Sequence, residues 1–210
     1  YPHQTSWGVT TRLIGAVIMT HGDNSGLVLP PAVAPIQVVI VPIAQHKEGV
    51  LDKANEILEK LKASGIRVKL DDSENSPGWK FSEYEMKGVP VRIEIGPRDI
   101  EEGHCIAAVR YSGEKQNVSL ENDFDTLVQK LHALLDKDIP EGMFAKAAEN
   151  RANRTYACTT LDEINKALEK GDGFIKAMWC GEEACEDEVK AKTGVGSRCI
   201  PFEQEHLSDV

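Results

Sequence analysis

Arg12 lies among residues whose side chains suit the binding of a polyphosphate. Residues 6–15 read Ser-Trp-Gly-Val-Thr-Thr-Arg-Leu-Ile-Gly, which predicts a glycine-punctuated strand with Arg12 near its middle and a loop over 19–26. A guanidinium group forks onto phosphate oxygens, and the hydroxyls of Thr10 and Thr11 would add neutral hydrogen bonds. Taken alone, the spacing favours an ordinary surface arginine.

Three cysteines near the end of the sequence have a spacing seen among thiolate metal ligands. Four residues separate Cys180 from Cys185, and thirteen more separate Cys185 from Cys199. Three thiolates would suit a zinc site that lacks one ligand. With five cysteines and no export leader, we expect no disulfide framework, and we expect Cys105 and Cys158 to be buried as small hydrophobic residues.

Composition places the chain among ordinary globular proteins. It has 210 residues, of which 41% are hydrophobic and 28% charged, and no apolar run approaches the roughly 20 residues of a membrane span. These features predict a cytoplasmic protein with no membrane partner. The net charge of −10 argues against nucleic-acid binding, because phosphate neutralisation supplies much of the affinity. The acids cluster, however, around 182–188, and residues 80–98 are locally basic, which is compatible with a basic patch.

The pattern along the chain predicts an α/β fold in three blocks. Prolines end the first block, at residues 1–35. The second, 36–137, alternates apolar strand patterns with an amphipathic helix at 47–64, and a second helix near 124–135 closes it. We expect a mixed β-sheet flanked by helices there, with Arg92 and Glu94 on the face opposite Val91 and Ile93. The third block, 138–210, predicts a small α+β domain.

Two segments of this sequence resemble motifs of a known protein family. Residues 6–15, followed by His-Gly-Asp-Asn-Ser-Gly-Leu-Val-Leu-Pro-Pro at 21–31, closely resemble the third signature motif of prolyl-tRNA synthetases of the branch shared by archaea, eukaryotes and some bacteria. The words Lys-Gly-Val-Pro-Val-Arg-Ile-Glu-Ile-Gly-Pro-Arg-Asp at 87–99 resemble the anticodon-binding domain of the same branch. The resemblance implies the C-terminal part of a class II synthetase: a remnant of the catalytic domain at 1–35, an anticodon-binding domain at 36–137 and a C-terminal zinc-binding domain at 138–210.

The resemblance implies an enzyme that uses ATP and Mg²⁺ to activate proline and then attaches it to tRNA(Pro). Arg12 would be its catalytic residue, binding ATP phosphate together with Thr10 and stabilising charge during attack on the α-phosphorus. Trp7 and Thr11 would lie by the proline pocket, although Trp7 is equally compatible with a packed core residue. The parent enzyme would be a homodimer. We expect the chain by itself to be inactive in adenylation, because it lacks the first two catalytic motifs.

The resemblance also assigns Glu85, Arg92 and Arg98 to the tRNA anticodon. A carboxylate accepts from guanine N1–H and N2–H, arginines donate to O6 and N7 or hold phosphates, and a proline anticodon carries two adjacent guanines. The alternative is a solvated sheet face and an ordinary loop cation. A non-catalytic RNA-binding or accessory module of the same α/β fold is the alternative function.

For the cysteines, the resemblance assigns two zinc ligands to Cys180 and Cys185. The other two ligands would belong to a cysteine pair beyond this sequence, and Cys199 would correspond to a residue that is not a ligand. We therefore expect an incomplete half-site, with Zn²⁺ in the intact protein and not in this chain, because two thiolates cannot build a closed tetrahedral site. A soluble α/β domain with only a structural zinc knuckle remains a third hypothesis.

Overall fold

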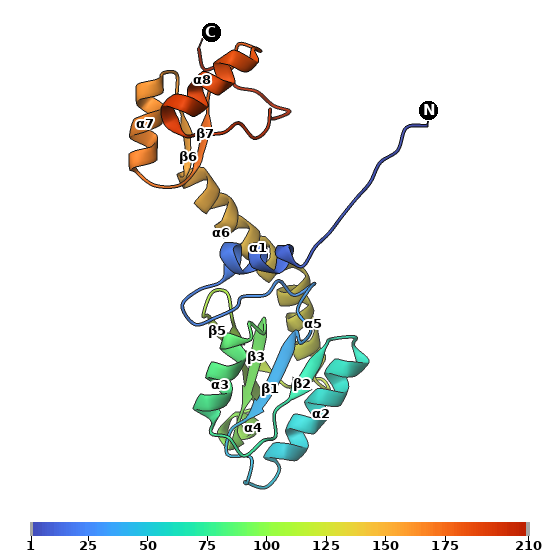
Figure 1. The fold of residues 1–210 in the computed structure, drawn as a ribbon. Helices are drawn as coiled ribbons and strands as arrows, with labels where there is room; N and C mark the ends of the chain where they lie inside the picture. Colours follow the sequence, from blue (N-terminus) through green and yellow to red (C-terminus); the bar gives the residue numbers. More distant parts are fainter. Residues whose placement is uncertain (1, 209–210) are drawn as a thin grey trace. The chain divides into compact units, whose positions relative to one another are not determined.

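The computed structural model describes residues 2–208, and the chain divides into two compact units, residues 1–145 and 146–210 (Figure 1). Each unit is described by itself. None of the helices in the described part of the chain is long and apolar enough to cross a membrane.

The first unit is built on a five-stranded mixed sheet in the order β2-β1-β3-β4-β5. The two neighbours of β1, which are β2 and β3, run parallel to it, whereas β3–β4 and β4–β5 are antiparallel. The strands have these bounds: β1 Val38–Pro42, β2 Val68–Leu70, β3 Val91–Ile95, β4 His104–Val109 and β5 Lys115–Ser119. The sheet confirms the predicted mixed α/β fold; the polar strand β5 escaped prediction because its sequence, Lys-Gln-Asn-Val-Ser, has only one apolar residue.

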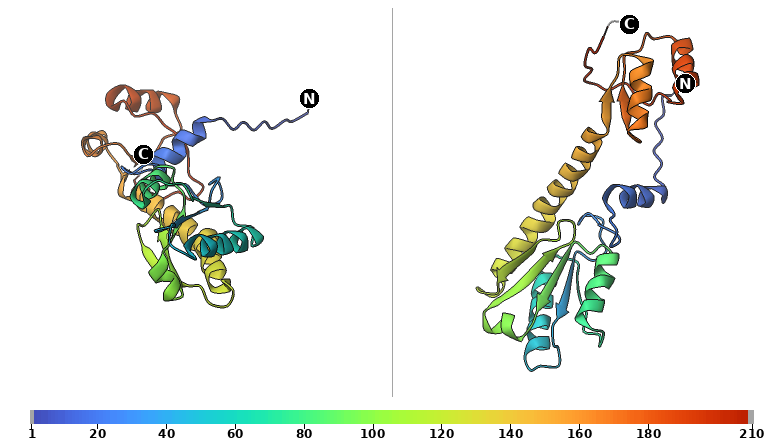
Figure 2. Two further views of the ribbon diagram at one scale, coloured as in Figure 1. Left: turned by 90° about the horizontal axis from the view of Figure 1, so that it is seen from below. Right: turned by 90° about the vertical axis from the view of Figure 1, so that its left-hand side faces the viewer.

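Helices cover the two faces of this sheet unequally. On one face α2 (Val50–Ala63) and α5 (Asp125–Ala133) bury their apolar sides in the main core. On the other face α3 (Pro77–Met86) packs on β1, where a smaller core contains Val39, Val41, Tyr84 and Val89. The right-hand view of Figure 2 shows α3 and α5 on opposite sides of the sheet. This second face is therefore filled by α3 over β1 and lined by polar side chains beyond it.

The end of α5 continues as a π-helical turn over Leu134–Asp138 and then as α6 (Ile139–Asn153). Pro140 has no N–H to donate to the preceding turn, and a wider helical turn before it absorbs the mismatch. The predicted domain boundary after residue 137 falls within this continuous helical run, whereas the compact units divide after residue 145.

The second unit contains the short parallel strands β6 (Thr155–Ala157) and β7 (Phe174–Lys176) and the helices α7 (Leu161–Glu169) and α8 (Glu183–Thr193). Thr160 caps α7: its Oγ1 accepts from the backbone N–H of Glu163 at 3.3 Å. A small core surrounds Cys158, which is buried as expected.

The strand predicted over 6–15 is wrong, because Arg12–His21 forms a helix, α1, with Arg12 in its first turn. None of the strands in the described residues pairs with 2–10. A strand without a partner leaves its backbone N–H and C=O groups unpaired, whereas a helix satisfies them within itself. The side chains of Leu13, Ile14 and Met19 on this helix are exposed.

Candidate nucleic-acid interface

β3 places Arg92 and Glu94 on the face of the sheet that α3 partly covers. In the sheet register Arg92 lies beside Val39 and Glu94 beside Val41, and both valines belong to the core beneath α3. The predicted alternation along this strand is therefore confirmed. The two charged residues are nevertheless only 8% and 6% exposed, so the alternative hypothesis of a solvated sheet face is wrong.

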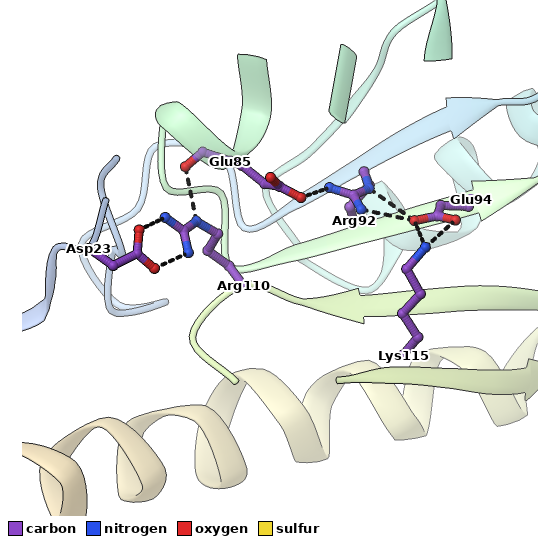
Figure 3. A network of polar contacts seen from close by, with 6 residues as sticks. All are labelled: Asp23, Glu85, Arg92, Glu94, Arg110 and Lys115. Atoms are coloured by element: carbon purple, nitrogen blue, oxygen red, sulfur yellow. Dashed lines mark hydrogen bonds and ion pairs between the residues drawn. The ribbon is translucent and has the colours of Figure 1, made fainter. Parts of the chain in front are cut away.

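Arg92 joins two carboxylates in this face (Figure 3). Its Nη1 donates to Glu85 Oε1 at 2.9 Å, and its Nε and Nη2 donate to Glu94 Oε1 at 3.1 and 2.9 Å. Lys115 of β5 places its Nζ 3.0 Å from Glu94. The Glu85 side chain is 41% exposed and that of Arg92 only 10%. The cluster therefore offers an accessible carboxylate that a buried guanidinium orients.

Phe81 adds an aromatic ring to the same cluster. The Arg92 guanidinium lies 4.0 Å from the ring centroid, and Lys115 Nζ lies 5.8 Å from it. Phe81 and Glu85 share a face of α3 because they are four residues apart on a helix. That spacing to Glu85 was available in the sequence and could have indicated Phe81. Nothing near Lys115 in the sequence indicates its place.

A second ion pair adjoins the cluster and was not predicted. Arg110, just after β4, donates through Nη1 and Nη2 to the two carboxylate oxygens of Asp23 at 2.7 and 2.6 Å, and through Nε to the backbone carbonyl of Glu85 at 2.9 Å (Figure 3). The hydrogen bond from Arg110 lowers the pKa of Asp23 from 3.8 to about 2. Residues 19–21 of the predicted loop over 19–26 belong to α1, and 23–26 form a turn closed by reciprocal Asp23–Gly26 backbone bonds of 3.1 Å.

These side chains line one cleft of about 350 Å³ in the first unit, with Asp23, Glu85, Arg92, Arg110 and Lys115 among its walls. It combines carboxylate acceptors, guanidinium and ammonium donors, and an aromatic ring beside it. Mixed donors and acceptors read the Watson–Crick edge of an unstacked base, and an aromatic ring stacks on its face. The arrangement suits single-stranded nucleic acid better than a duplex.

Arg98 is not part of this cluster. It lies in α4 (Pro97–Glu101), which follows the end of β3, whereas Glu85 lies beside the beginning of that strand. Its side chain is exposed. The structure thus brings together two of the three residues predicted for the anticodon and places the third elsewhere on the same unit.

Of the residues predicted for ATP and proline, Thr10, Thr11 and Arg12 lie at the start of α1, and Trp7 precedes them in a segment without regular secondary structure. The backbone N–H of Arg12 donates to Thr10 Oγ1 at 3.3 Å, and Thr11 is the residue before the helix. Trp7 is 92% exposed, so its interpretation as a packed core residue is wrong.

Cys180 and Cys185 lie close together, as the spacing predicts. A hydrogen bond with Cys180 raises the pKa of the Cys185 thiol. Cys199 is exposed, and among the described residues no group of three or more histidine, cysteine or acidic side chains could hold a metal ion. The pair supplies two of the four donors that a structural zinc ion requires, so these residues do not fit a closed site.

Comparisons with known proteins agree with this geometry. Residues 37–130, which contain the sheet and most of the cleft, match the family model described as anticodon binding domain. The chain thus contains an anticodon-binding domain of the aminoacyl-tRNA synthetase type. Residues 161–209 match a second model, described as prolyl-tRNA synthetase, C-terminal.

Relatives identify the family more narrowly. The proline–tRNA ligase of Ruminiclostridium cellulolyticum is 58% identical over 209 residues, covering 100% of this chain and 42% of the relative. That of Alkaliphilus oremlandii is 59% identical over 208 residues, covering 99% and 42%. The crystal structure of Cryptosporidium parvum prolyl-tRNA synthetase complexed with L-proline and AMP has a TM-score of 0.84 and 38% identity, covering 94% of this chain and 43% of that one. The chain belongs to the prolyl-tRNA synthetase family, and it spans about 42% of the length of these curated relatives.

Proposed function

We propose that this chain recognises the anticodon of tRNA(Pro) as part of a proline–tRNA ligase. The observation that carries the proposal is the cluster of Glu85, Arg92 and Phe81 within the matched anticodon-binding domain. The Glu85 carboxylate accepts from N1–H and N2–H of an anticodon guanine, and Arg92 holds that carboxylate in place and donates to the base. The Phe81 ring stacks on a base. Arg98, beyond the other end of β3, makes a separate contact to base or phosphate.

The net charge of −10 sets the character of this interaction. An acidic protein gains little from general phosphate neutralisation, so specific base contacts supply a large share of the affinity. We therefore expect a strong preference for the cognate anticodon and a shallow dependence of affinity on salt.

The test is a titration of the 210-residue chain with tRNA(Pro) and with the same tRNA after both anticodon guanines are replaced. We expect at least tenfold tighter binding of the unmodified tRNA, because each wrong base costs about 1–3 kcal/mol. Glu85→Gln should reduce this preference about tenfold. Glu83→Gln is the matched control on the same helix, since Glu83 pairs with Lys87 outside the cluster. Equal affinity of the wild-type chain for both tRNAs would contradict the proposal and favour the non-catalytic RNA-binding module.

For the intact protein we infer ATP-dependent activation of proline, with Arg12 and Thr10 on the ATP phosphates and Trp7 and Thr11 by the proline. The place of Arg12 in the first turn of α1 supports this, because the N-terminal end of a helix favours anions. Mg²⁺ would neutralise phosphate charge. In a protein of the relatives' length, Arg12→Ala should lower proline-dependent ATP–pyrophosphate exchange at least a hundredfold, and the 210-residue chain should show none. We also propose that the intact protein works in the cytoplasm, where it would meet its tRNA substrate, and that it is a homodimer.

For the intact protein we also propose a zinc ion bound by Cys180 and Cys185 together with two ligands from outside this chain. The close approach of the two thiols supports the pair as half of a site. Metal analysis of the purified 210-residue chain should find well below one zinc per chain, because two thiolates are not a closed site. A full equivalent that Cys180→Ser removes would contradict this expectation.

A further inference from the structure

The segment that follows α1 is fastened along the C-terminal end of α3. The backbone N–H of Leu27 donates to the carbonyl of Met86 at 3.0 Å, and that of Leu29 donates to the carbonyl of Gly88 at 3.2 Å. A Cβ on Gly26 would lie 2.5 Å from the Met86 Cα, so the two backbones approach too closely for any larger residue. This contact sets the distance of the 23–26 turn from the helix end that carries Glu85.

Arg110, just after β4, links the 23–26 turn to the C-terminal end of α3. Its side chain is only 8% exposed, and all three of its nitrogen groups donate, two to the carboxylate of Asp23 and one to the carbonyl of Glu85. A bidentate guanidinium–carboxylate pair fixes the plane of the guanidinium as well as its position. Asp23 therefore orients Arg110, and Arg110 holds the backbone of Glu85.

Glu85 also contacts a second arginine: its side-chain carboxylate accepts a hydrogen bond from Arg92. Glu85 is thus held at its carbonyl by Arg110 and at its carboxylate by Arg92 (Figure 3). Fixing both ends limits the directions in which the half-exposed carboxylate can point. A carboxylate that is held in one direction discriminates better between cognate and wrong bases. It cannot rotate to form a hydrogen bond with the wrong base.

We propose that Asp23 and Arg110 are positioning residues for anticodon selectivity: they act through Glu85 and do not themselves contact the base. The inference rests on the proposed function. It assigns a role in tRNA discrimination to a turn that lies outside the matched anticodon-binding domain, 87 residues from Arg110 in the sequence.

The test uses Asp23→Asn in the 210-residue chain. Asparagine keeps a side-chain oxygen for the Ser25 N–H, which Asp23 Oδ1 accepts at 2.9 Å, so the turn is preserved while the charged fork is lost. We expect about a tenfold loss of preference for the unmodified tRNA(Pro) over the tRNA with both guanines replaced, without weaker binding of the latter. Arg110→Lys should act in the same direction, and it replaces Asp23→Asn if that variant does not fold. Asp123→Asn, which weakens the Lys60 ion pair elsewhere on the unit, is the matched control and should change nothing.

A variant cycle separates positioning from a merely structural role. If Asp23 acts through Glu85, Asp23→Asn combined with Glu85→Gln should lose no more preference than Glu85→Gln alone. Two results would overturn this inference alone. One is a double variant whose loss of preference is the product of the two single losses, and the other is an unchanged preference in each of the single variants Asp23→Asn and Arg110→Lys. A wild-type chain without any anticodon preference would overturn the proposed function and this inference with it.

Discussion

Replacing Arg92 by methionine removes the central cation of the cluster, which lies over Phe81, and keeps an unbranched apolar side chain in its place. Arg92 gives three hydrogen bonds to two carboxylates, and one of them, Glu94, is as deeply buried as Arg92 itself. Removing one member of a buried ion pair costs about 3–5 kcal/mol, because the remaining charge is left without its partner. Glu94 keeps Lys115 and Glu85 is partly hydrated, so we expect a cost of about 2 kcal/mol in the free energy of unfolding of this unit.

Native-state hydrogen exchange of the β1 and β3 amides measures this cost in the first unit alone. A loss of about 2 kcal/mol should accelerate the exchange about 30-fold. Adding Glu94→Gln to Arg92→Met should recover about half, because a neutral amide is cheaper to bury than an unpaired carboxylate. Lys62→Met, which removes an exposed pair with Glu59, should cost less than about 0.5 kcal/mol. The reasoning is refuted if Arg92→Met behaves like Lys62→Met, or if Glu94→Gln adds a further loss.

Two other changes test different parts of the first unit. Gly142→Ala should destabilise it by about 1–3 kcal/mol in urea unfolding, because the new Cβ would lie 2.2 Å from the Tyr111 hydroxyl oxygen. As the control, Gly78→Ala in α3 should be neutral or stabilising, because its new Cβ would meet nothing within 4 Å. Equal effects of the two substitutions would contradict this prediction. The Asp23–Arg110 pair should make wild type about 1 kcal/mol more stable than Asp23→Asn at pH 6, after allowing for solvent screening of a 45% exposed carboxylate. Because the pKa of Asp23 is lowered to about 2, this difference should be full above pH 4 and disappear as the pH falls through 2; a difference that does not change with pH would show that the ion pair contributes no stability.

The sequence by itself determined the secondary structure around the main core and the family. Period-two alternation at Val91–Ile95 and the one-sided apolar spacing of Val50–Ala63 depend on residues only a few positions apart, and such local patterns are visible in a sequence. The words at 6–31 and 87–99 likewise identify the family without any coordinates. The family resemblance assigned Glu85 and Arg92 to one site, and the structure places them in contact.

Only the tertiary structure decided which charges meet and whether they are buried. Arg92 and Glu94 occupy positions that alternation assigns to a polar face, and they become buried because Glu85 and Phe81 of α3 and Lys115 of β5 cover them. The extended state of residues 6–15 depended on a partner strand, and without one in the described residues the segment from Arg12 is helical.

The Asp23–Arg110 pair shows most clearly that the sequence alone does not determine which charged residues meet. The two residues are 87 positions apart, and their meeting depends on strand order, on the close backbone contact at Gly26 and on the end of α3. Local patterns report neighbours within a few residues, whereas an ion pair is set by the packing of whole elements. The sequence therefore supplied the chemical groups of the site, and the fold chose their partners.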